Sequence, residues 1–230
     1  MTTVPDYVFT PPTPFGVPVK GSNKLFPVRR IYCVGRNYAA HIREMGGDER
    51  ALPFFFQKPA DAIVLNGASI PYPPETQDYQ YEIELVLAIG TGGADIAVAN
   101  AAKHVFGVAV GIDLTRRDLQ LKARDTGRPW ESGKSFDNSA PISAIHPLKG
   151  DIPKSGRIAL SVNGTEKQRG DLNEMIWQSD EIVAHLSKLF ALVPGDLIYT
   201  GTPSGVGKLA PGDQVEGTIE NLDTLAISIR

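Results

Sequence analysis

The chain has 230 residues, of which 42% are hydrophobic and 21% charged, and its formal net charge is −3. This size allows one large domain with a buried core, or two small ones. The small negative charge argues against a nucleic-acid partner, and the single cysteine excludes an internal disulfide framework and a cysteine-based zinc site. No apolar run reaches the roughly 18–20 residues needed to span a bilayer, and the proline-rich N-terminal sequence is unlike a signal peptide. The chain is therefore expected to be cytoplasmic.

The predicted elements begin after an extended, proline-rich arm at residues 1–26, and residues 27–230 are expected to form a single domain. Residues 31–34 are a predicted short strand. The sequence RNYAAHIREMGG then predicts a helix over residues 37–46, with Asn37 as its N-cap. The apolar run PFFFQK predicts a further short strand that ends at a proline.

Most later elements are strands. YEIELVLAIG alternates with the period of a strand, whereas VFGVAVGI is apolar throughout and is expected to be buried on both faces. RRDLQLKARDTG predicts a short helix, IALSVNGTEKQRG a hairpin that turns at Asn163-Gly164, and SDEIVAHLSKLF a helix capped by Ser179. Two Pro-Gly-Asp turns each precede a C-terminal strand. This order predicts an α+β fold of mixed β-sheets arranged as a roll or sandwich.

Three carboxylates emerge from two of the apolar strands. Glu82 and Glu84 are two residues apart, so both lie on one face of their strand, and Asp113 follows the next long strand. Carboxylates on a half-buried surface repel each other unless a cation compensates them. Oxygen ligands favour Mg²⁺ or Mn²⁺, with Ca²⁺ also possible. The alternatives are a solvated edge strand for the glutamates and a helix-capping role for Asp113.

His41 and Glu44 form a second candidate pair. Three residues apart on the predicted helix, they share one face and can touch. A carboxylate beside an imidazole raises its basicity and orients it, which is the usual arrangement for activating water. The alternative is an ordinary surface contact between a histidine and a glutamate.

Several further polar residues follow predicted strands. Lys58 and Lys134 are each either a loop lysine in solvent or a site residue, and Arg117 and Gln120 are expected to share roughly the face of Asp113 on a helix. The sequence TGTPSGVGK is not a phosphate-binding loop, because its glycines are separated by five residues rather than four and Leu209 replaces the required Ser or Thr.

Six segments occur in the order found in one protein family. They are GRNYAAHIREMG, FFFQKPADAI, YEIELVLAIG, GIDLTRRDLQ, GKSFDNSAPIS and YTGTPSGVG, and they extend from about Arg29 to the C-terminus. In this combination the chain resembles the fumarylacetoacetate hydrolase family, and within it the acylpyruvate hydrolases. The resemblance implies a β-roll, a homodimer and a catalytic domain over residues 27–230.

The resemblance also implies roles for single residues. The implied metal ligands are Glu82, Glu84 and Asp113; the implied catalytic residues are His41, Glu44 and Lys134; the implied substrate contacts are Lys58, Arg117, Gln120 and Thr202.

The implied reaction is metal-dependent hydrolysis of the C–C bond of a 1,3-dicarbonyl 2-oxo acid, with fumarylpyruvate, an intermediate of aromatic catabolism, as the expected substrate. The same metal site would also suit an oxaloacetate decarboxylase or an oxo-enoate hydratase or isomerase, and a Ca²⁺-stabilised β-protein without activity would need only the acids. A second substrate carboxylate requires a cation, for which Arg36, Arg43, Arg124 and Arg128 are available. Arg124 or Arg128 is the preferred candidate.

Overall fold

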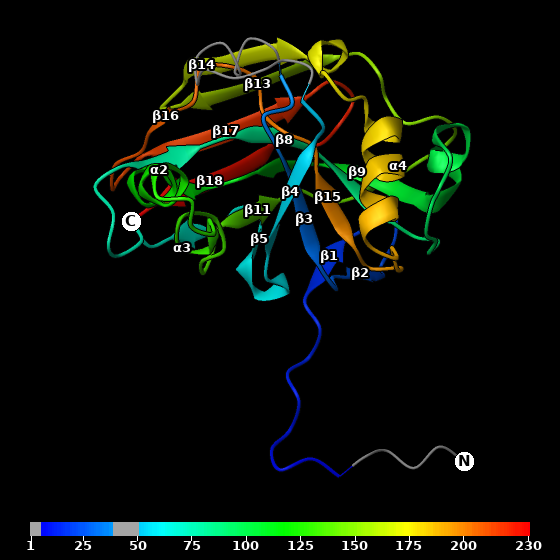
Figure 1. Cartoon of the computed structure of the whole chain (residues 1–230). Coiled ribbons are helices and arrows are strands. Elements are labelled where there is room, and N and C mark those ends of the chain that lie inside the picture. Colours follow the sequence, from blue (N-terminus) through cyan, green and yellow to red (C-terminus); the bar gives the residue numbers. More distant parts are fainter. Residues whose placement is uncertain (1–5, 39–50) are drawn as a thin grey trace.

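The computed structural model describes residues 6–38 and 51–230, and within these ranges the strands form sheets of two, three, eight and five strands. Figure 1 shows the two larger sheets stacked in layers, with helix α4 (Ser179–Leu189) on one flank and helices α2 (Arg117–Asp125) and α3 (Glu131–Lys134) on the other. Parallel and antiparallel pairs occur in both larger sheets. The predicted α+β fold of mixed sheets is confirmed.

The eight-stranded sheet contains the most apolar segments of the chain. Its strands run in the order β4-β3-β15-β8-β9-β11-β5, and β12 pairs with β9. Their bounds are β3 (Ile31–Gly35), β4 (Phe54–Lys58), β5 (Ile63–Leu65), β8 (Ile83–Ile89), β9 (Val105–Ile112), β11 (Ala140–Ile142), β12 (His146–Pro147) and β15 (Leu197–Tyr199). All of β8 and all of β9 except Phe106 are buried, as the continuous apolar sequence of β9 predicted.

The five-stranded sheet covers the eight-stranded one. Its order is β14-β13-β17-β18-β6, with β6 (Ser69–Ile70), β13 (Arg157–Val162), β14 (Thr165–Asp171), β17 (Gln214–Ile219) and β18 (Leu225–Ile229). The predicted hairpin is confirmed: Val162 pairs with Thr165, and the turn residues Asn163 and Gly164 have φ of 52° and 75°. Both values are positive, as a two-residue hairpin turn requires.

The smaller elements complete the described fold. A three-stranded sheet contains β7 (Tyr79–Tyr81), β10 (Thr115–Arg116) and β16 (Gly207–Lys208), and a two-stranded sheet contains β1 (Gly16–Pro18) and β2 (Leu25–Pro27). The 3₁₀ helices are η1 (Ala60–Ala62), η2 (Val98–His104) and η3 (Leu172–Glu174).

Two local predictions need correction. Helix α4 starts at Ser179, but its N-cap is Gln178, whose backbone amide donates a 2.8 Å hydrogen bond to the side chain of Glu181. Ser179 is the first helical residue, and its hydroxyl has no hydrogen bond among the described residues. The predicted cap was therefore wrong by one residue, because the carboxylate of Glu181 fixes the backbone of Gln178 at the start of the helix.

The N-terminal segment is only partly an arm. Residues 6–15 extend away from the body, whereas the β1–β2 hairpin packs against it with Val17 and Phe26 buried. The predicted helix at residues 37–46 falls mostly outside the described residues. The division into an arm over residues 1–26 and a domain over residues 27–230 stays a prediction.

The two faces of β8 belong to different parts of the core. Ile83, Leu85 and Leu87 pack into the large cluster that includes residues of the five-stranded sheet, while Val86 and Ala88 join a second cluster on the other side. Because side chains alternate along a strand, Glu84 lies on the face of Val86. The acids therefore stand on the side of β8 that faces away from the five-stranded sheet.

Candidate active site

The pairing of β8 with β9 brings the three carboxylates together. Ile83 lies opposite Ile112, so Glu82 lies opposite Asp113, and the amide of Asp113 donates a 2.8 Å hydrogen bond to the carbonyl of Glu82. Directly opposite residues on antiparallel strands share a face. Glu82 itself falls in a break between β7 and β8, although the sequence predicted an uninterrupted strand there. The break does not separate the acids.

The acids form one compact, buried group. One oxygen each of Glu82, Glu84 and Asp113 lies within 4.8 Å of the others, and the three residues are 6%, 1% and 1% exposed. The interpretation as a solvated edge strand is therefore wrong. Asp113 is also no helix cap, because the residue preceding α2 is Arg116.

Three buried cations surround the acids. Lys134, at the end of α3, donates to Glu82 at 2.9 Å and to Asp113 at 2.7 Å. Lys58, at the end of β4, lies 2.9 Å from Oδ1 of Asp113, and Arg117 forms an ion pair with Glu82. The charges of these three acids and three cations sum to zero when all are ionised. Each of these cations pairs with Glu82 or Asp113, so the protein itself compensates part of the negative charge of the acids.

Arg117 and Gln120 reach the site by a different route from the one predicted. They were expected to share a helical face with Asp113, but α2 begins only at Arg117, so Asp113 is not on that helix. Instead, Arg117 spans between Glu82 and the side chains of Gln80 and Gln120. The prediction placed both residues near the acids for the wrong reason.

The surroundings raise the pKa of both Lys134 and Glu84, which favours the charged form of the lysine and the neutral form of the glutamate. Burial alone would lower the pKa of Lys134, but the carboxylates of Asp113 and Glu82 outweigh burial and raise it, so Lys134 remains protonated. Burial is the main cause that raises the pKa of Glu84 well above its usual value, and the nearby charges of Asp113 and Glu82 add to it. A hydrogen bond from the amide of Gly201, at 2.7 Å, opposes this rise. Burial thus disfavours the ionised form of Glu84, and a bound cation would favour it.

Lys134 has no spare hydrogen in this arrangement. Its ammonium group donates to Glu82 and Asp113 and, at 2.7 Å, to the hydroxyl of Thr115. An ammonium group has three hydrogens. The predicted role of Lys134 in stabilising an oxyanion therefore requires it to release one of these partners.

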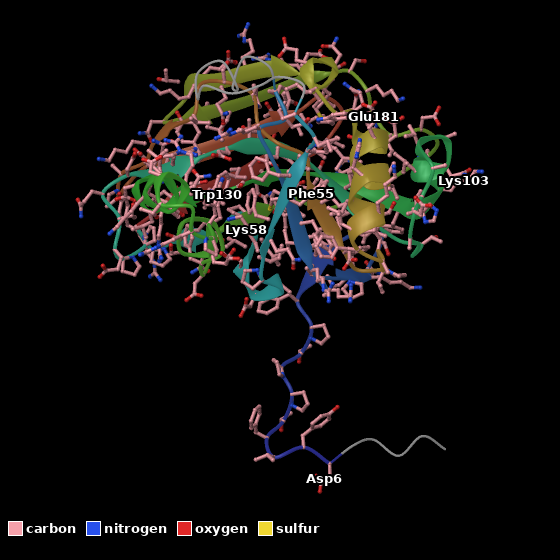
Figure 2. The ribbon with its side chains drawn as sticks, viewed as in Figure 1. Asp6, Phe55, Lys58, Lys103, Trp130 and Glu181 are labelled. Carbon is pink, nitrogen blue, oxygen red and sulfur yellow. The ribbon has the colours of Figure 1, made fainter. Side chains whose placement is uncertain are left out.

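A pocket opens beside the acids. It is lined by Val34, Gly35, Arg36, Phe56, Glu82, Glu84, Gln120, Leu121, Arg124, Trp130, Lys134, Gly201 and Thr202. Its aromatic wall is built where the ring of Trp130 lies 5.1 Å from that of Phe54 and 5.9 Å from that of Phe56. Figure 2 shows Trp130 and Lys58 on the same side of the body. The pocket therefore has an acidic and cationic end and an apolar wall.

Some of the remaining predicted site residues line the pocket and others do not. Lys58 and Arg117 are buried next to the acids but do not line the pocket, whereas Gln120 and Thr202 do. Of the arginines expected to meet a second carboxylate, Arg36 and Arg124 line the pocket, while Arg128 is exposed outside it. His41, Glu44 and Arg43 lie outside the described residues.

Sequence reasoning missed several residues around the site. Trp130, Phe56 and Leu121 form part of the apolar wall of the pocket. No periodic pattern in their segments predicts that these side chains line a pocket. Gln168 is fully buried behind Thr202, yet it lies within the polar strand TEKQRGD, where nothing distinguishes it from its solvent-exposed neighbours. A single buried polar residue in a polar strand has no sequence signature.

Comparison with known proteins identifies relatives over most of the chain. The family described as fumarylacetoacetate (FAA) hydrolase C-terminal matches residues 30–230. Fumarylpyruvate hydrolase of Ralstonia sp. is 46% identical over 76% of this chain and 92% of its own length. Mitochondrial oxaloacetate decarboxylase of Dictyostelium discoideum is 40% identical over 85% of this chain and 91% of its own length. The crystal structure of fumarylpyruvate hydrolase from Pseudomonas aeruginosa in complex with Mn²⁺ and pyruvate superposes with a TM-score of 0.95 at 50% identity, covering 97% of this chain and 99% of that one.

Proposed function

The chain belongs to the fumarylacetoacetate hydrolase family, and on that premise we propose that it is a metal-dependent hydrolase that cleaves fumarylpyruvate to fumarate and pyruvate. The observation that carries the proposal is the buried group of Glu82, Glu84 and Asp113, whose oxygens lie within 4.8 Å of one another beside a pocket that Glu82 and Glu84 line. The hydrolase name of the Ralstonia relative supports the reaction.

The donor set fits a hard divalent cation. The metal-binding group found among the described residues consists of three carboxylates, without cysteine or histidine, which favours Mg²⁺ or Mn²⁺, with Ca²⁺ possible. Oδ1 of Asp113 is buried and makes no hydrogen bond in the described structure, although Lys58 lies 2.9 Å away. The Pseudomonas relative was crystallised with Mn²⁺ and pyruvate, which supports the same ion and a 2-oxo acid here.

Charge balance favours a substrate with two negative charges. With Glu84 ionised, the three acids balance Lys58, Lys134 and Arg117, so a divalent ion makes the site positive, and the cations Arg36 and Arg124 line the same pocket. Because leaving unmatched charge in a buried site is costly, this excess of positive charge favours an anion with more than one carboxylate. Fumarylpyruvate has two carboxylates, whereas acetylpyruvate has one.

Each site residue has its own role in the proposed hydrolysis. A bound divalent ion supplies Lewis-acid chemistry at the 2-oxo acid end of the substrate. His41, oriented by Glu44, removes a proton from the water that attacks the distal carbonyl. The bond between that carbonyl and the adjacent CH₂ breaks, its electron pair passes to the pyruvate part, and a proton returns there to give pyruvate. Lys134 stabilises the oxyanion formed by the attack once it releases one of its three partners, Glu82, Asp113 or Thr115, while Gln120 and Thr202 orient the substrate.

Lys58 and Arg117 act from behind this pocket. Both are buried against the acids, Lys58 at Asp113 and Arg117 at Glu82, and neither lines the pocket. We assign them to holding the ligand carboxylates in place rather than to direct contact with substrate. Outer partners of this kind orient metal ligands and tune their affinity.

Decarboxylation of oxaloacetate is the second candidate. It is supported by the oxaloacetate decarboxylase of Dictyostelium discoideum, which matches 85% of this chain. The hydrolase is favoured because the pocket extends past the acids to Arg36 and Arg124, which leaves room for an acyl group and a second carboxylate. The enzymes among the relatives also disfavour a Ca²⁺-stabilised protein without activity.

We propose a cytoplasmic homodimer that acts in aromatic catabolism and uses Mg²⁺ where that ion is abundant. The apolar side chains of Leu52 and Phe54 are 73% and 37% exposed, and the ring of Phe54 contacts Trp130 of the pocket wall, so both offer contact area to a second copy. Among the described residues, no helix combines the length and apolar character needed to cross a membrane.

Substrate preference tests the proposal. We expect kcat/KM for fumarylpyruvate to exceed that for acetylpyruvate by roughly ten- to a hundredfold, since a charged hydrogen bond contributes about 1.5–3 kcal/mol. Arg124→Met should reduce this preference, because Arg124 lines the pocket. Steady-state kinetics on both substrates, with release of fumarate and pyruvate measured directly, provide the check.

Arg128→Met is the matched control, since Arg128 is exposed in the same segment outside the pocket, and it should keep the preference. Arg36→Met should be measured in parallel, because Arg36 also lines the pocket. Equal rates on both substrates in the unmodified enzyme would make it a general acylpyruvate hydrolase.

A further inference from the structure

Gln168 is a fully buried glutamine in an otherwise polar strand. It lies in β14 of the five-stranded sheet with 0% exposure, while the three residues before it are exposed. A buried amide is costly unless its polar atoms are hydrogen-bonded. Its partners therefore indicate why a glutamine stands there.

The side chain of Gln168 connects two segments of the proposed active site. Its oxygen accepts a 3.0 Å hydrogen bond from the amide of Ile83, the residue between the two glutamates. Its nitrogen donates to the hydroxyl of Thr202 at 2.9 Å and to the carbonyl of Pro203 at 2.8 Å. The amide orientation is determined chemically, because an amide N–H only donates and a carbonyl only accepts.

This orientation fixes what the Thr202 hydroxyl can do. Its oxygen accepts from Gln168, and the described structure contains no acceptor for its own hydrogen. Thr202 lines the pocket next to Gly201, whose amide donates to Glu84. The hydroxyl hydrogen is thus available to an anion in the pocket rather than to the protein.

We propose that Gln168 is a positioning residue that commits the Thr202 hydroxyl to donate a hydrogen bond to the bound 2-oxo acid. The inference rests on the proposed function for the identity of the ligand. Gln168 itself does not line the pocket, so its effect on binding passes through Thr202. Its bond to Ile83 ties the same amide to the segment that carries Glu82 and Glu84.

The test is a double-mutant cycle on pyruvate binding to the Mn²⁺-loaded protein, measured by calorimetry. Thr202→Val and Gln168→Met should each weaken binding by about tenfold, the loss of one hydrogen bond to a charged group. The double variant should bind no more weakly than either single variant, because both remove the same interaction. Thr202→Ser should keep the affinity of the unmodified protein.

Two further variants separate positioning from general destabilisation. Gln168→Glu keeps the shape but turns an oxygen toward Thr202, so the hydroxyl donates to Glu and pyruvate binding weakens. Gln214→Met, an exposed glutamine in the same sheet, should change nothing. Mn²⁺ affinity and thermal midpoint are measured for every variant.

Additive losses in the double variant, or unchanged pyruvate affinity in Gln168→Met and Gln168→Glu, would overturn the role of Gln168 while leaving the proposed function intact. A folded, Mn²⁺-loaded unmodified protein that binds no pyruvate would overturn the proposed function together with this inference.

Discussion

Replacing Glu84 by glutamine is expected to abolish stabilisation by divalent metal and to lower hydrolysis by more than about 100-fold. The carboxylate is 1% exposed and lies within 4.8 Å of two others, so its removal takes away one of three ligands. Removing a residue that only hydrogen-bonds to a metal ligand already lowers metal affinity or activity by about 10- to 100-fold. Calorimetry with Mn²⁺ and Mg²⁺, together with steady-state kinetics, measures both effects.

The same substitution should stabilise the metal-free protein as the pH rises. Burial and neighbouring carboxylates raise the pKa of Glu84 in the folded state above its usual value of 4.5. The folded protein therefore holds this proton more tightly than the unfolded chain, and stability is lost as the pH rises from 4.5 through the raised pKa. Glutamine carries no charge and avoids this loss, while its oxygen can still accept from Gly201.

Melting temperatures in chelator across this range test the sign of the effect. The advantage of Glu84→Gln over the unmodified protein should grow with pH, and added Mn²⁺ should reverse the order. Glu216→Gln, an exposed glutamate in β17, is the control and should show neither effect. An equal thermal shift with Mn²⁺ in Glu84→Gln and the unmodified protein would contradict its role as a ligand.

His41→Ala is expected to reduce fumarylpyruvate hydrolysis by at least about 100-fold, the lower range for loss of a general base. Mn²⁺ and pyruvate affinity should remain unchanged, because His41 is assigned to the attacking water and not to the metal. Decarboxylation of oxaloacetate should survive, since loss of CO₂ needs no attacking water. Rates on both substrates separate the two activities.

Glu44→Gln should reproduce part of the loss, because Glu44 is the partner proposed to raise the basicity of the His41 imidazole. His104→Ala is a control outside the pocket lining; the ring of His104 lies 3.0 Å from the carbonyl of Thr91. Hydrolysis that proceeds undiminished in His41→Ala would return His41 to an ordinary surface residue.

The acidic group could be predicted from sequence because its signals are local. The alternation of apolar and polar residues placed Glu82 and Glu84 on one face of a strand. Asp113 was recognisable because it is a charged residue at the end of an otherwise apolar strand. Pairing of Ile83 with Ile112 then brings Asp113 opposite Glu82. Adjacent apolar strands pair often enough for this to be expected.

The surroundings of the acids could not be predicted in the same way. Lys58, Arg117 and Lys134 come from a strand end and two helices, and in sequence each resembles a residue in solvent. Their burial depends on how α3 packs against β4 and how α2 packs against α3, which no periodicity in the sequence encodes. Gln168 is harder still, since its partners lie 85 and 34 residues away.

Small errors at element ends have a similar origin. Gln178 and Ser179 both carry a side chain able to cap a helix, and only the backbone geometry selects Gln178. The break at Glu82 likewise leaves the alternation intact while removing that residue from the ladder. Such choices depend on tertiary packing rather than on propensity.

The most direct test of the account is fumarylpyruvate cleavage by exhaustively chelated protein before and after metal is restored. The account predicts no release of fumarate or pyruvate in chelator, and recovery with Mg²⁺ or Mn²⁺ that exceeds recovery with Zn²⁺, because the donors of Glu82, Glu84 and Asp113 are all oxygen. Full turnover by the chelated protein would contradict it.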